Sequence, residues 1–91
     1  NAWCFEPDLS FNVTKARALV RAYDALRPLS AAERAALPVL AQGAAIRFAL
    51  TRLFDWLNTP ADALVTRKDP MEYVRRLRLH LTAKDAGAYG L

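Results

Sequence analysis

Three polar residues at helical spacing are the clearest chemical signal in this sequence. Arg47, Thr51 and Asp55 are four residues apart, so on an α-helix they lie on one face over about 12 Å. An arginine can bind both oxygens of a carboxylate, and an aspartate suits an ammonium group. We interpret the stripe either as a row of structural salt bridges or as one wall of a polar pocket for an amino acid.

Aromatic, basic and acidic side chains extend the list of candidates. Trp3 and Trp56 are either core residues or pocket walls, because a tryptophan face can also stack a cation. Glu6 follows an apolar run and is either a surface charge or a pocket carboxylate. The candidate substrate-binding residues are Arg47, Asp55, Trp56, Arg52, Trp3 and Glu6. No catalytic residue is assigned.

The residues that nucleotide and metal sites need are missing. The three glycines are too scattered to form a phosphate-binding loop. Cys4 and His80 cannot hold structural zinc, which takes about four ligands. A single cysteine is typical of a reduced, cytoplasmic protein, and we expect Cys4 to be a small buried hydrophobe. For His80 we expect a place at a helix end, near the last carbonyls.

The composition indicates one packed domain without a membrane span. The chain has 91 residues, of which 54% are hydrophobic, and no stretch approaches about 18 uncharged apolar residues. The net charge of +4 is weaker than the clustered footprint of a nucleic-acid binder. We therefore expect neither nucleic acid nor a membrane as a partner.

The elements that must position the candidates are helices. A helix is predicted over residues 13–26, with Asn12 as its N-cap, and it ends before Pro28. Ser30 and Glu33 form a capping box that begins a short helical turn. Because Pro38 would clash inside a continuous helix, we place a break near Leu37. A long helix then runs to about residue 57.

The long helix is apolar on nearly all faces, which predicts that it is buried. A loop is expected over residues 59–68, followed by a helix with Asp69 as N-cap and Pro70 at the first position. The apolar seam of this last helix is predicted to comprise Met71, Val74, Leu77 and Leu81. The tail over 84–91 is either loose or docked by Tyr89 and Leu91.

The sequence therefore predicts an all-α fold of three main helices and a short one, forming one unit over residues 1–91. The uncapped apolar opening over residues 1–5 indicates a cut inside an element, so we expect a fragment of a longer chain. Part of the apolar surface would then face the rest of that chain. Alone, the segment is expected to be molten or prone to aggregation.

Four stretches in the same order resemble the C-terminal part of bacterial homoserine kinases. They are NAWCFEPDLSFN, RPLSAAERAALPVL, GAAIRFALTRLFDWLNTP and KDPMEYVRRLRLH. The resemblance implies membership of the aminoglycoside/choline phosphotransferase group, which has a protein-kinase-like fold. It also implies an enzyme that transfers the γ-phosphate of ATP to the hydroxyl of L-homoserine, a step in threonine biosynthesis.

In that family the nucleotide loop, the ATP-binding lysine, the catalytic aspartate and the metal-binding aspartate all lie upstream. The resemblance thus implies that ATP and magnesium are bound by an upstream kinase-like domain, and that this segment closes over the acceptor. It assigns no acceptor contacts, so the six candidates remain inferences from the residues. Two alternatives stay open: a related choline or aminoglycoside phosphotransferase, and a non-catalytic helical binding module.

Overall fold

The computed structural model describes residues 1–64 and 66–91, and the regular elements of these residues are helices, without a β-strand. Its elements are α1 (Val13–Leu26), α2 (Ala31–Asn58), α3 (Met71–Thr82) and the 3-10 helix η1 (Ala86–Tyr89). Phe5 and Phe11 form one isolated antiparallel bridge. The prediction of an all-α fold is confirmed.

Helix α1 has the predicted bounds because local side chains satisfy its ends. The Asn12 side chain accepts a hydrogen bond of 3.0 Å from the Lys15 N–H, which satisfies one orphan donor of the first turn. The Arg27 N–H donates to the Tyr23 carbonyl. Arg27 itself is extended, as the residue before a proline prefers to be.

Helix α2 begins at the predicted capping box but does not break at the proline. Ser30 Oγ accepts from the Glu33 N–H, and Glu33 accepts from the Ser30 N–H, both at 3.1 Å. The break near Leu37 is wrong, since α2 continues through Pro38 to Asn58. Pro38 is buried, so we attribute the unbroken helix to packing that offsets the lost hydrogen bond. The short fourth element is η1 in the tail.

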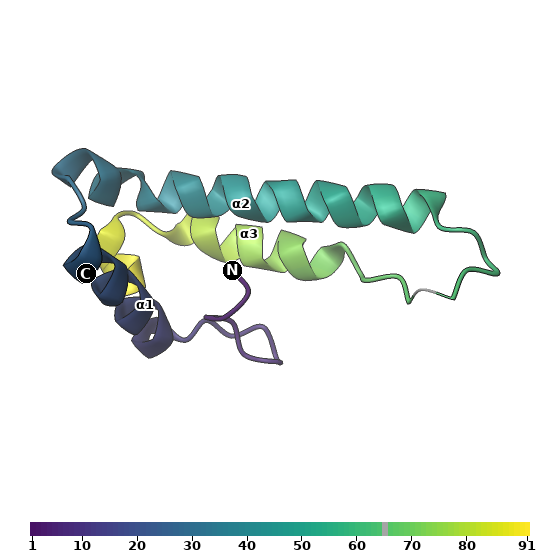
Figure 1. Ribbon diagram of the computed structural model, residues 1–91, viewed down its shortest axis with the longest axis horizontal. Helices are drawn as coiled ribbons and strands as arrows, with labels where there is room; N and C mark the ends of the chain where they lie inside the picture. Colours follow the sequence, from purple (N-terminus) through teal and green to yellow (C-terminus); the bar gives the residue numbers. More distant parts are fainter. Residues whose placement is uncertain (65) are drawn as a thin grey trace.

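Helices α2 and α3 run antiparallel as a long hairpin (Figure 1). The predicted loop is non-helical over 59–64 and 66–70, while position 65 lies outside the described residues. Helix α3 begins at Met71 with Pro70 in the N-cap position, so the prediction of Asp69 as N-cap is wrong by one residue. Asp69 Oδ1 accepts a hydrogen bond from the Met71 N–H at 2.9 Å. The predicted seam is wrong at Met71 and Leu81, which are exposed; Tyr73 and His80 are the buried residues of α3.

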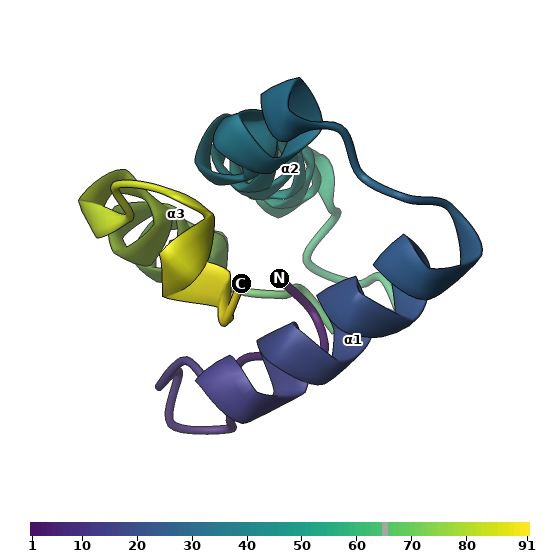
Figure 2. The ribbon, with the colours of Figure 1, turned by 90° about the vertical axis from the view of Figure 1, so that its left-hand side faces the viewer.

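The core joins the two ends of the chain. Figure 2 shows the yellow tail close to α1, and η1 contacts both α1 and α2. Tyr89 packs with Cys4 and Ala16 in a buried cluster. Phe11, Leu37, Ala41, Ala83 and Ala88 surround that cluster. The prediction that Cys4 is buried is confirmed, and the tail is docked by Tyr89.

Within the described residues, α2 is covered on one face only. Ala45 is fully buried, and Phe48 stacks on Tyr73 of α3 with ring centroids 5.2 Å apart. Other large apolar side chains of α2 are exposed, including Leu50 and Leu57. The all-round burial expected from the sequence is therefore not reached. Among the described helices, none combines the length and the apolarity that crossing a membrane requires.

Candidate functional site

A cavity of about 430 Å³, the α2 cavity, lies at the carboxyl end of α2 and brings two predicted residues together. It is lined by Arg52, Asp55, Thr59, Thr66, Arg67 and Lys68. The last turns of α2 supply the first two side chains, and the loop before α3 supplies the basic pair. Three cations and one carboxylate give the cavity a positive excess that suits an anionic group, with one position for an ammonium group.

Arg52 is the most firmly held of these side chains. Its Nη1 donates to the Asp69 carbonyl at 3.0 Å and to Glu72 Oε2 at 2.9 Å. Its guanidinium carbon lies 4.5 Å from the centre of the Tyr73 ring. These contacts fix Arg52 between α2 and α3, so it forms a pre-oriented wall whose charge Glu72 partly balances.

Trp56 lies beside the cavity as a platform for Arg67. The Arg67 guanidinium carbon is 4.3 Å from the Trp56 ring centre, and its Nη1 donates to the Trp56 carbonyl at 3.1 Å. Sequence reasoning missed Arg67 and Lys68, because a loop has no periodicity that shows which helix its side chains reach. The available signal was the pair of Trp56 and Arg67 on either side of the predicted loop start, since an arginine favours a tryptophan face.

The predicted stripe on α2 does not form one site. Arg47 and Asp55 are exposed, and no ion pair joins them in the described part of the chain. Thr51 Oγ1 donates to the Arg47 carbonyl, one turn back. The Arg47 guanidinium lies 5.7 Å from the Phe48 ring. Only Asp55 of the three residues lines the α2 cavity.

Trp3 and Glu6 lie away from the α2 cavity. Trp3 is exposed, with Lys15 Nζ 5.7 Å from its ring. Glu6 pairs with Lys15 at 3.0 Å and accepts from Asn12 Nδ2 at the same distance. These hydrogen bonds, Lys15 first, lower the pKa of Glu6. Glu6 is thus an ionised carboxylate that already has partners.

Glu6 lines a second cavity of about 430 Å³, together with a partly buried arginine. The Arg76 guanidinium lies 4.4 Å from the Tyr73 ring and 5.5 Å from the Phe5 ring. Its Nε and Nη1 are buried and have no hydrogen-bond partner among the described residues. Glu72 is 3.9 Å from Nη1 and already accepts from Arg52. Nothing in the α3 seam pattern predicted this arrangement.

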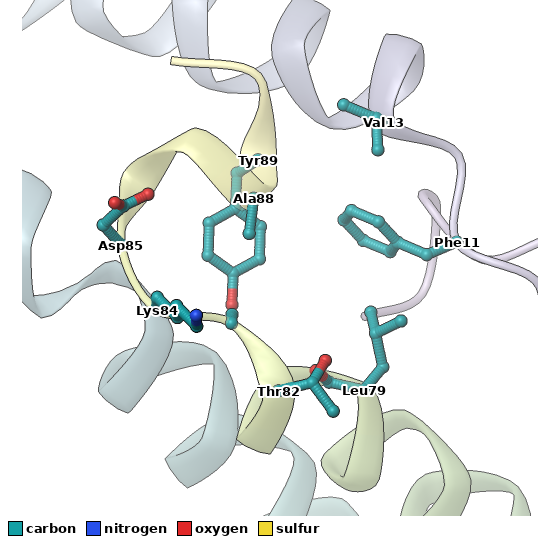
Figure 3. A pocket seen from close by; sticks show the side chains of 9 residues that line it. Phe11, Val13, Leu79, Thr82, Lys84, Asp85, Ala88 and Tyr89 are labelled. Atoms are coloured by element: carbon teal, nitrogen blue, oxygen red, sulfur yellow. The ribbon is translucent and has the colours of Figure 1, made fainter.

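Another cavity, of about 500 Å³, lies between the start of α1, the end of α3 and η1. Figure 3 shows Phe11 and Tyr89 beside each other in its wall, with Leu79 and Thr82 contributed by α3. The lining is mostly apolar, and Lys84 and Asp85 are its charged residues. A charged amino acid therefore fits this cavity less well than the α2 cavity.

His80 lies in the last turn of α3, as the sequence predicted, but its side chain is buried. Its Nε2 lies 2.8 Å from Asn1 Oδ1, and its Nδ1 lies 3.0 Å from the Tyr89 hydroxyl. Burial lowers the pKa of His80 to about 4, so the ring is neutral at physiological pH. Across the residues that the structure describes, no three His, Cys, Asp or Glu side chains gather to hold a metal ion.

Comparison with known proteins identifies relatives over the whole chain. All 91 residues match proteins named homoserine kinase, at 71% identity in Granulibacter bethesdensis, 71% in Acidiphilium cryptum and 65% in Xanthobacter autotrophicus. The chain spans 28% of the length of each. No protein-family model matches it. The resemblance seen in the four stretches is confirmed: over its whole length, this chain is similar to one segment of homoserine kinases.

Proposed function

We propose that this chain is the C-terminal helical part of an ATP-dependent homoserine kinase that acts in the cytoplasm. The longer protein would transfer the γ-phosphate of ATP to the hydroxyl of L-homoserine, in threonine biosynthesis. The observation that carries the proposal is the 71% identity over all 91 residues to two proteins named homoserine kinase. The all-helical structure agrees with a subdomain of a protein-kinase-like fold.

The described residues do not fit ATP and magnesium. They contain no cluster of three metal-ligating side chains, and the described glycines 43, 87 and 90 form no phosphate loop. Nucleotide and metal would therefore be bound by a kinase-like domain elsewhere in the longer protein. No step of the phosphoryl transfer is assigned to this chain.

The part that this chain plays would be positioning of the acceptor. Homoserine carries an ammonium and a carboxylate, and the α2 cavity offers Asp55 for the first and Arg52 with Lys68 for the second. Phosphoryl transfer depends mainly on positioning and on charge stabilisation. A fixed Arg52 would hold the carboxylate of homoserine, so that the hydroxyl of homoserine points away from α2 toward the nucleotide.

The reaction is tested with the full-length protein that contains this chain. ATP consumption is measured with homoserine, choline, ethanolamine and an aminoglycoside in parallel. We expect turnover with homoserine alone. Turnover with another acceptor instead would retain phosphotransfer and reject the substrate, whereas no turnover with any of them would reject the proposed function.

The acceptor site is tested with Asp55→Asn, compared with Arg47→Ala as a control outside the cavity. We expect Asp55→Asn to raise the KM for homoserine by roughly tenfold or more, because an ammonium loses its charged partner. The KM for ATP should not change, and Arg47→Ala should leave both values unaltered. An unchanged homoserine KM in Asp55→Asn would remove the α2 cavity from the acceptor site.

A further inference from the structure

An uninterrupted apolar strip runs along the face of α2 that no described element covers. The α2 strip consists of Val39, Gly43, Ile46, Leu50, Leu53 and Leu57. Its five large side chains are between 43% and 72% exposed. A Cβ placed on Gly43 would meet nothing within 4 Å, so the space above it is open. The strip contains no polar or charged side chain.

The spacing of the α2 strip is that of a helix-packing seam. Its members follow one another at intervals of four, three, four, three and four residues. This alternation keeps side chains on one face of a helix, with the 3.5-residue period by which two helices pack lengthwise. The strip is about 27 Å long at 1.5 Å per residue. Gly43 would let a neighbouring backbone approach closely.

The size of the strip favours a partner within the same polypeptide. A lengthwise contact about 27 Å long and 10 Å wide covers roughly 300 Å² on each side. Specific interfaces between separate proteins bury about 800 Å² per partner, so a second copy seated here alone would bind weakly. The chain spans only 28% of the length of its relatives, which leaves most of their sequence available to supply cover.

We propose that, in the longer protein, a helix from outside these 91 residues packs lengthwise on the α2 strip. This inference rests on the proposed function in one respect, that the chain is part of a longer protein. A tethered helix pays no cost of bringing separate molecules together, so a modest apolar contact suffices. The partner is expected to present an apolar stripe of its own with small side chains opposite Gly43.

Thiol labelling of the full-length protein tests the proposal. Leu50→Cys places a thiol on the strip, and Thr51→Cys places one on an adjacent, exposed position outside it. Each native variant is treated with iodoacetamide, and modification at that position is followed by mass spectrometry. We expect the thiol at position 50 to react roughly 100-fold more slowly than that at 51, because its labelling requires local opening. Leu57→Cys repeats the test at the end of the strip.

Equal rates at positions 50 and 51, whether fast or slow, would overturn the inference. Protection at position 50 that disappears on dilution, together with a change from dimer to monomer in light scattering, would also overturn the inference. The strip would then be covered by a second copy of the protein. Phosphotransfer to homoserine is assayed on the full-length protein without substitutions. Protection at 50 without homoserine turnover would reject the proposed function while the packing inference stands.

Discussion

His80 and Tyr89 lie nine residues apart and join through Nδ1 of the imidazole and the phenolic hydroxyl, at 3.0 Å. The other ring nitrogen is 2.8 Å from Asn1 Oδ1, which can only accept a hydrogen bond. Nε2 therefore carries the proton, and Tyr89 donates to Nδ1. Accepting the Tyr89 hydrogen bond at Nδ1 needs a neutral imidazole, in agreement with the pKa of about 4 that burial produces.

The neutral His80 predicts a loss of stability in mild acid. Its folded pKa of about 4 lies below the ordinary value of 6.5, so the unfolded chain binds more protons between these pH values. Its contribution is complete above pH 6.5 and declines as the pH falls toward 4, by at most about 1.4 kcal/mol per pH unit. Urea unfolding of the full-length protein at pH 7 and pH 5 measures this.

His80→Gln is the matched variant for that measurement, because glutamine cannot titrate. It is expected to be less stable than the parent at pH 7 and to show a smaller change between pH 7 and pH 5. An equal pH dependence in both proteins would show that other groups cause the loss.

Gly90 is expected to tolerate no side chain. Its φ of 86° is left-handed, and an added Cβ would lie 2.5 Å from the Arg17 Cβ in α1. Gly90→Ala should destabilise the protein by about 1–2 kcal/mol from the backbone alone, and more from the clash. The urea midpoint measures the loss. Gly87→Ala is the control, since its Cβ would meet only the movable Asp85 carboxylate; equal losses would contradict the prediction.

Arg76 is expected to be dispensable for stability. Two of its buried nitrogens have no hydrogen-bond partner among the described residues, and such unpaired groups cost about 1–3 kcal/mol each. Arg76→Met removes both and keeps a flexible side chain between the aromatic rings. Thermal unfolding of the full-length protein should show an unchanged or higher midpoint, with Arg75→Met as an exposed control. A clear drop for Arg76→Met alone would show that the contacts of Arg76 with Tyr73, Phe5 and Glu72 outweigh the cost of its unpaired nitrogens.

The isolated 91 residues are expected to form a loosely packed or aggregating species. The α2 strip is exposed in them, and large exposed apolar patches bind other apolar surfaces. The segment should bind the dye ANS strongly and unfold without a sharp transition. A cooperative thermal transition of a monomeric segment would contradict this expectation.

Local signals in the sequence predicted the helix ends well. Asn12 and the Ser30–Glu33 box act through bonds within three residues, so their geometry depends little on the rest of the fold. Pro38 misled the prediction because its local cost is real but is outweighed by burial between elements. That balance depends on packing, which the pattern around residue 38 does not contain.

The structure brings only Arg52 and Asp55 of the candidate site residues together in one cavity, for a related reason. Periodicity placed Arg47 and Asp55 on one face, but cavities form where separate elements meet. Arg52 reaches Asp69 and Glu72 across 17 and 20 residues, and Arg67 reaches Trp56 from the loop. These partners depend on the course of the chain between α2 and α3. Likewise, the burial of Tyr73 comes from its ring contact with Phe48 of α2, and that of His80 from its bonds to Asn1 and Tyr89.

The bond between His80 and Asn1 has a consequence for the order in which the chain folds. It spans 79 residues, whereas the Arg52 contacts that join α2 to α3 close loops of 17 and 20. Closing a longer loop costs more entropy, and distant contacts form more slowly. We therefore expect the hairpin to assemble first and the two ends to meet last. A mild denaturant should separate the ends while the hairpin is still intact.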